Sequence, residues 1–180
     1  MIIPRSMNDF TDSDVQRLIE VASRRFGDRE YWVIRVPARL CLAADHTDYW
    51  EAFTPELVTF ASDSATMKAV ISPRTDSMVR MFNVGDFEDC EFDLNEDAPP
   101  RATGSNSWLE WLDARGTPSA HWSNYVRGSV HHAQMHHDVN VGFDLLIDSN
   151  IPPASGASSS SALATCASIA IRLVNDLPLE

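Results

Sequence analysis

Two short segments carry side chains whose types and spacing could bind phosphate or a sugar. The first is residues 153–161, Pro-Ala-Ser-Gly-Ala-Ser-Ser-Ser-Ser, between an apolar stretch and a long apolar helical pattern. Gly156 allows a sharp turn because glycine tolerates a positive φ. A helix N-terminus presents unpaired N–H groups and a partial positive charge, which together favour an anion. The run fits a phosphate site, and it is equally typical of a serine-rich turn before an ordinary helix.

The serines of this run add a second kind of chemistry. Hydroxyl groups donate hydrogen bonds to phosphate oxygens, and one of them can ligate Mg²⁺. The run contains neither the G-x-x-x-x-G-K spacing of a Walker A loop nor the G-x-G-x-x-G spacing of a dinucleotide fold. Any phosphate site here is therefore built from backbone N–H groups and hydroxyls.

The second segment is a polar cluster that follows a strand-like stretch. It contains Asp45, His46, Asp48 and Tyr49, with Arg39 just upstream. Carboxylates accept hydrogen bonds from sugar hydroxyls, and imidazole and phenol groups supply further polar contacts. An arginine can neutralise charge on a transferring phosphoryl group. Read from its residues alone, the cluster is also compatible with an acidic surface turn or with half of a metal site.

Hydrophobic periodicity predicts the elements that position these segments. We expect helices over 11–26, 108–114, 122–137 and 158–175, and strands over 31–36, 40–43, 56–61, 66–72, 78–83, 90–94 and 143–148. Pro37 is expected to break the first two strands apart, and 66–72 with 78–83 to form a hairpin about the turn 73–76. Residues 95–107 are expected to form an exposed loop. Strands followed by helices indicate an α+β fold.

Composition narrows the class of protein. The chain has 180 residues, which suits one domain, and a formal net charge of −12, which disfavours binding to nucleic acid or to an anionic membrane. Its 3 cysteines are far apart and indicate a reducing compartment, so we expect a cytoplasmic protein. We expect neither a signal peptide nor a membrane span. Four histidines between 131 and 137 are interpreted as a solvated helix end, with metal binding as the lesser alternative.

Three segments carry a resemblance to a known family. The serine-rich run resembles the P-x-x-G-L-S-S-S phosphate loop of the GHMP kinase superfamily, and departs from it at Ala157 and Ser161. Residues 38–49 resemble the motif G-R-V-N-L-I-G-E-H-T-D-Y of the galactokinase family, which Arg39 and residues 46–49 match outright. Residues 122–128 resemble the W-x-N-Y-V-K-G helix of that family. Residues 50–52, Trp-Glu-Ala, replace its usual N-G-G and leave the sugar open.

The resemblance implies a fold and a reaction. It implies a GHMP kinase N-terminal domain, ribosomal protein S5 domain 2-like, over residues 1–180, in which a mixed sheet packs against helices. It also implies that the C-terminal GHMP domain is absent. It implies that ATP, with Mg²⁺, phosphorylates a hexose, with galactose to galactose 1-phosphate as the first choice. Alternatives are another sugar (N-acetylgalactosamine, fucose or a uronic acid) or a non-catalytic sensor of sugar and ATP.

The resemblance also assigns roles to residues. Arg39 would stabilise the transition state, and Asp45, His46, Asp48 and Tyr49 would contact the sugar. The nucleotide would be held by Pro153, Ser155, Gly156, Ala157, Ser158, Ser159, Ser160 and Ser161, with Ser160 as the Mg²⁺ ligand. The catalytic aspartate of the family belongs to a downstream Gly-rich segment that these 180 residues lack. We therefore expect the 180-residue chain to be inactive alone and to self-associate through an exposed apolar surface.

Overall fold

The computed structural model describes residues 13–43, 58–96, 98–101, 107–153 and 155–179. Within these residues the elements follow one another in the order α1 (Ser13–Phe26), β1 (Trp32–Ala43), β2 (Val58–Pro73), β3 (Met78–Asn83), β4 (Cys90–Asp93), α2 (Ser107–Arg115), α3 (Ser123–His136), β5 (Phe143–Ser149) and α4 (Ser159–Val174). The arrangement confirms the expected α+β class with a mixed sheet.

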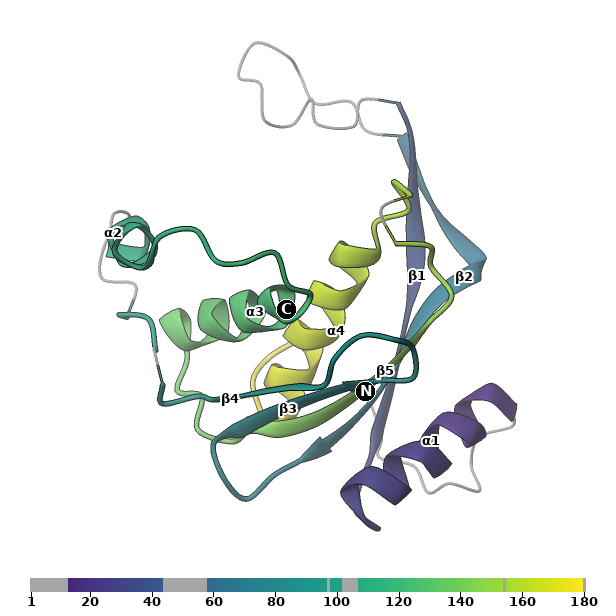
Figure 1. The fold of residues 1–180 in the computed structure, drawn as a ribbon, viewed down its shortest axis with the longest axis horizontal. Coiled ribbons are helices and arrows are strands. Elements are labelled where there is room, and N and C mark those ends of the chain that lie inside the picture. The colour runs from purple at the N-terminus through teal and green to yellow at the C-terminus, as the bar shows by residue number, and fades with distance from the viewer. Residues whose placement is uncertain (1–12, 44–57, 97, 102–106, 154, 180) are drawn as a thin grey trace.

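The five strands form one sheet with helices on both faces. The strand order is β1-β2-β5-β3-β4; β3 and β5 are parallel and the other neighbouring pairs are antiparallel. Figure 1 shows α3 and α4 on one face of the sheet and α1 on the other. The larger apolar core lies between the sheet and α3 and α4, and a smaller core lies under α1.

Helix α1 shows why the helical predictions succeed. Its apolar residues recur at helical spacing, and the five that the periodicity selects are all buried: Val15, Leu18, Ile19, Ala22 and Phe26. Gly27 then adopts φ +84° and donates its N–H to the carbonyl of Ser23, which ends the helix. The predicted helices 108–114, 122–137 and 158–175 are confirmed within a few residues as α2, α3 and α4.

The predicted hairpin of 66–72 with 78–83 is wrong, because β5 lies between β2 and β3. Strand β5 is apolar on both faces: Leu145 and Ile147 belong to the larger core and Leu146 to the smaller one. Such a strand is stable only at the centre of a covered sheet. The connection from β2 to β3 therefore passes over the start of β5, where Gly142 exchanges backbone hydrogen bonds with Arg74 and Asp76.

The predicted breaks in the first strands are also wrong. Residues 32–43 form one strand through Pro37, and 58–73 form another, so 56–61 and 66–72 are not separate strands. β1 is an edge of the sheet among the described strands. A proline is tolerated there because its missing N–H removes no bond from a central ladder. The irregularity that Pro37 signals is a register shift between Pro37 and Arg39.

The strands predicted over 90–94 and 143–148 are confirmed as β4 and β5. Among the described residues, no helix is both long enough and apolar enough to span a membrane.

Candidate functional site

The serine-rich run forms a tight loop between β5 and α4. Gly156 has φ +77° and Ser158 has φ 57°, and α4 begins at Ser159. A left-handed conformation is uncommon for a residue other than glycine. Left-handed residues within a turn direct successive backbone N–H groups toward a common point, which makes an anion-binding concavity. The expected sharp turn at Gly156 is confirmed, and Ser158 adds a second one.

The loop is anchored on one side and open on the other. Ile151 and Ala157 are buried in the core beneath α4. The hydroxyl of Ser155 donates to the carbonyl of Pro152 at 2.8 Å and closes the turn. Ser155 and Gly156 are exposed. The buried alanine thus holds the backbone in place while the glycine side faces solvent. Residue 154 lies outside the described residues.

The first turn of α4 is suited to an anion. The N–H of Ala162 donates to the carbonyl of Ser158 at 3.0 Å, which is the first bond of the helix. The preceding N–H groups of Ser159, Ser160 and Ser161 have no partner within a helix. The Ser158 side chain makes no capping hydrogen bond, and the first turn contains no acidic residue. The positive end of the helix dipole is therefore available to a ligand.

Arg39 lies in the distal half of β1, opposite Ala61 of β2. Its neighbour Ala38 is buried in the larger core, whereas the Arg39 side chain is partly exposed. Helix α4 packs against both β1 and β2, so the serine-rich loop before α4 and the strand that carries Arg39 belong to one packed unit. Asp45, His46, Asp48 and Tyr49 lie outside the described residues.

Asn150 is a residue of this region that the sequence analysis missed. It follows β5 directly, and its side chain contacts the backbone of Ser64 and Thr66 in β2. The available signal was an asparagine between a strand and a proline-containing turn, since such side chains often bond to nearby backbone. That signal predicts a local turn and gives no hint of a partner more than 80 residues away.

Two titratable side chains in α3 and α4 have shifted pKa values. Burial raises the pKa of the Cys166 thiol in α4 to about 12, so that thiol stays protonated. Burial also lowers the pKa of His132 at the exposed end of α3, with a further contribution from His136. Among the described residues, no group of three or more His, Cys, Asp or Glu side chains could hold a metal ion.

Part of the sequence that forms this site matches a known family model. Residues 124–180, which include α3, β5, the loop and α4, match the model described as GHMP kinases N terminal domain. Over this segment the chain is similar to the N-terminal domain of the GHMP kinases. The resemblance drawn from the serine-rich loop is thereby confirmed at the level of the superfamily and of its fold.

Two curated galactokinases are similar to a longer part of the chain than the family model matches. The galactokinase of Chloroflexus aggregans is 34% identical over 157 residues, which are 87% of this chain and 35% of that protein. The galactokinase of Chloroflexus aurantiacus is 31% identical over 167 residues, 92% of this chain and 37% of that protein. The chain thus spans little more than a third of the length of these curated relatives.

Solved structures of the superfamily share the fold. Lactococcus lactis galactokinase complexed with galactose superposes with a TM-score of 0.72 at 24% identity, over 93% of this chain and 39% of the other. Methanococcus jannaschii mevalonate kinase superposes with a TM-score of 0.55 at 16% identity, over 83% of this chain and 42% of the other. At these identities the likeness establishes the GHMP kinase fold.

Proposed function

We propose that this chain supplies the nucleotide loop and the sugar-contacting residues of an ATP-dependent sugar kinase. In the reaction the anomeric hydroxyl of a hexose attacks the γ-phosphorus of ATP, the bond to the β-phosphate oxygen breaks, and the hydroxyl proton passes to a base. The products are a sugar 1-phosphate and ADP. Galactose is the first candidate substrate, because the curated relatives are galactokinases at 31% and 34% identity.

The observation that carries the proposal is the backbone of the loop. Two left-handed residues, Gly156 and Ser158, stand directly before a helix whose first turn has no acidic residue and no side-chain cap. Phosphate oxygens fit such a concavity, because the N–H groups and the helix dipole both favour negative charge. Ser158 and Ser159 would add hydroxyl donors, within a binding segment that runs from Pro153 to Ser161.

Magnesium would be held by Ser160, because a hydroxyl oxygen is the hard donor that this ion prefers. When bound, Mg²⁺ would neutralise charge on the β- and γ-phosphates of ATP. Arg39 would stabilise the charge that develops on the transferring phosphoryl group. Asp45, His46, Asp48 and Tyr49 would hydrogen-bond the sugar hydroxyls. In this proposal residues 1–180 act as the N-terminal domain, and a second domain supplies the catalytic aspartate.

The test uses the gene product read through to its natural stop codon. It is incubated with ATP, Mg²⁺ and single sugars (galactose, N-acetylgalactosamine, glucose, fucose and galacturonate), and phosphorylated sugar is measured by mass spectrometry. We expect galactose 1-phosphate, abolished by chelation of Mg²⁺ and by Arg39→Ala. Arg24→Ala removes an exposed arginine on the opposite face of the sheet and is expected to leave the rate unchanged.

The outcomes separate the alternatives. ATP binding without product from any sugar would favour a sensor of sugar and ATP over a kinase. Phosphorylation of another sugar in the set would keep the reaction and correct the substrate. Absence of ATP binding would overturn the role given to the serine loop.

A further inference from the structure

Asn150 joins the start of the phosphate loop to the middle of β2. Its side-chain Oδ1 accepts a hydrogen bond from the N–H of Thr66 at 2.7 Å, and its Nδ2 donates to the carbonyl of Ser64 at 2.8 Å. Its backbone N–H donates to the carbonyl of Thr66 at 3.3 Å. The last regular pair of the β2–β5 ladder joins Met67 to Ser149. Asn150 therefore extends the attachment of β5 to β2 beyond the end of the ladder.

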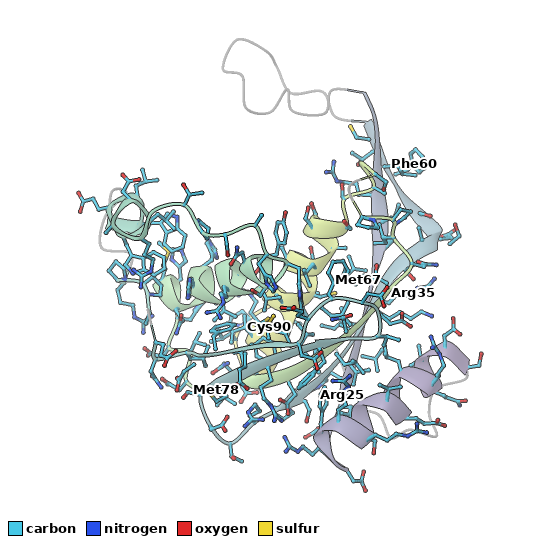
Figure 2. All side chains as sticks on the ribbon, in the orientation of Figure 1. Arg25, Arg35, Phe60, Met67, Met78 and Cys90 are labelled. Carbon is cyan, nitrogen blue, oxygen red and sulfur yellow. The ribbon has the colours of Figure 1, made fainter. Side chains whose placement is uncertain are left out.

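The segment of β2 to which Asn150 is hydrogen-bonded forms a bulge. Pro37 pairs with Thr66 and Arg39 pairs with Ala61, so residues 62–65 stand opposite Ala38 alone. Within the bulge the N–H of Ala65 donates to the hydroxyl of Ser62 at 3.0 Å. From the side of β1, Arg35 donates to the carbonyl of Asp63 at 3.0 Å. Figure 2 shows Arg35 beside the middle of the β1–β2 pair, below Phe60 at its far end.

The bulge therefore has the two halves of the candidate site as its neighbours. On one side is β1, which carries Arg39 immediately beyond the register shift. On the other side is Asn150, one residue before Ile151, where the path to the phosphate loop begins. Figure 1 shows this path rising along β2 and then turning into α4. A change in the Asn150 contacts would move one half of the site relative to the other.

We propose that Asn150 is a positioning residue that sets the distance between the phosphate loop and the strand carrying Arg39, and so aligns the phosphoryl donor with the sugar. The proposal rests on the proposed kinase function. Each substrate would keep its own contacts when the Asn150 side chain is removed, because neither the loop backbone nor the polar cluster at 45–49 includes that side chain. What is lost is their mutual alignment, and a misplacement of about 1 Å can cost about a hundredfold in rate.

The central experiment compares Asn150→Ala with wild-type protein read through to its natural stop codon, with galactose as the sugar. We expect kcat to fall by about ten- to a hundredfold. The dissociation constants of ATP and galactose, measured separately by calorimetry, are expected to change by less than about threefold, which is below 1 kcal/mol. Asn150→Asp keeps an Oδ1 that can accept from the Thr66 N–H and loses the donor to the Ser64 carbonyl, so it provides a milder variant should the alanine variant fold poorly.

Asn175→Ala is the matched control. The side chain of Asn175 also bridges distant backbone, accepting from the N–H groups of Asn140 and Val141 and donating to the carbonyls of Val141 and Ile171. It does so at the opposite end of α4 from the phosphate loop. Its loss is expected to lower stability and to leave the kcat of folded protein unchanged. An unchanged kcat in Asn150→Ala, or equal losses of kcat in both variants, would overturn the proposal.

Hydrogen exchange separates failure of this proposal from failure of the proposed function. In Asn150→Ala, and not in Asn175→Ala, the amides of residues 62–66, 151 and 155–158 are expected to exchange faster than in wild type. A wild-type protein that phosphorylates no sugar would overturn the kinase function and the catalytic role of Asn150 with it. The exchange data would then still decide whether Asn150 couples the bulge to the loop, and unchanged exchange would refute that coupling.

Discussion

At the scale of single residues, the serine-rich loop between β5 and α4 depends on backbone conformations that most residues avoid. A non-glycine residue in the left-handed region carries a cost of about 1–2 kcal/mol, and Ser158 occupies that region at φ 57°. Such strain concentrates at functional sites, where the surrounding structure maintains it. Here the buried Ala157 and the first bond of α4 lie on either side of the strained backbone.

Gly156→Ala tests this backbone directly. Alanine disfavours φ +77°, so the loop would relax and its N–H groups would no longer converge on a phosphate. We expect ATP affinity, measured by calorimetry, to fall at least about tenfold, or 1.4 kcal/mol. Gly116→Ala is the control, because Gly116 has φ +71° and the same free space around an added Cβ but follows α2. Equal ATP affinity in the two variants would contradict the loop's role.

The predictability of the site differs from residue to residue. The turn at Gly156 could be predicted, because glycine is the usual residue at a positive φ. The left-handed Ser158 could not, because serine before a helix normally predicts an extended N-cap that bonds to the first turn. Asn150 was missed for a different reason: its partners Ser64 and Thr66 are close only after the sheet has formed.

At the scale of elements, the sheet is organised around β5. Local patterns identified each strand but paired β2 with β3, because a short connection between apolar stretches usually indicates a hairpin. The apolar pattern of 143–148 contained the correction, since a strand apolar on both faces belongs at the centre of a sheet. Which strands flank it depends on contacts between distant residues, and a pattern along the chain does not carry that information.

An arginine cluster holds these elements together on the α1 face. Asp144 of β5 is fully buried and accepts hydrogen bonds from Arg29, Arg74 and Arg80. Arg80 belongs to β3, Arg74 to the connection between β2 and β3, and Arg29 to the segment after α1. The carboxylate therefore ties the central strand to the elements on either side of it. Asp76, which also binds Arg74, has its pKa lowered to about 2 by that contact.

Asp144→Asn is expected to destabilise the fold strongly. The substitution removes the negative charge that compensates three arginines, so we expect the free energy of unfolding to fall by about 3 kcal/mol. This is the lower end of the range for breaking a buried ion pair, because Arg29 and Arg80 are partly exposed. Urea unfolding measures the change in the free energy of unfolding. Asp148→Asn, on the same strand, removes a more exposed pair with Arg17 and is expected to cost less than about 1 kcal/mol. Similar costs for both variants would show that the cluster has no special role.

At the scale of the whole molecule, the two faces of the sheet are covered unequally along its length. The cores lie between the helices and the central part of the sheet, whereas β1 and β2 continue beyond α1 as a long pair (Figure 1). On that extension Leu40 and Phe60 stand directly opposite each other, with exposed fractions of 36% and 46%. An exposed apolar pair beside an edge strand is a site at which chains associate.

This surface gives a concrete form to the expected self-association of the 180-residue chain. We expect concentration-dependent dimers by analytical ultracentrifugation, strengthened by salt because the net charge of −12 repels like chains. Phe60→Ser should weaken association about tenfold, since burying a phenylalanine contributes about 1.5–3 kcal/mol. Phe87→Ser removes a phenylalanine that is 58% exposed and lies beside Trp122, away from this pair, and should leave association unchanged. If both serine variants weaken association equally, the chains associate through exposed apolar residues in general and not through the β1–β2 extension. A wild-type chain that stays monomeric at every protein and salt concentration would contradict the expected self-association.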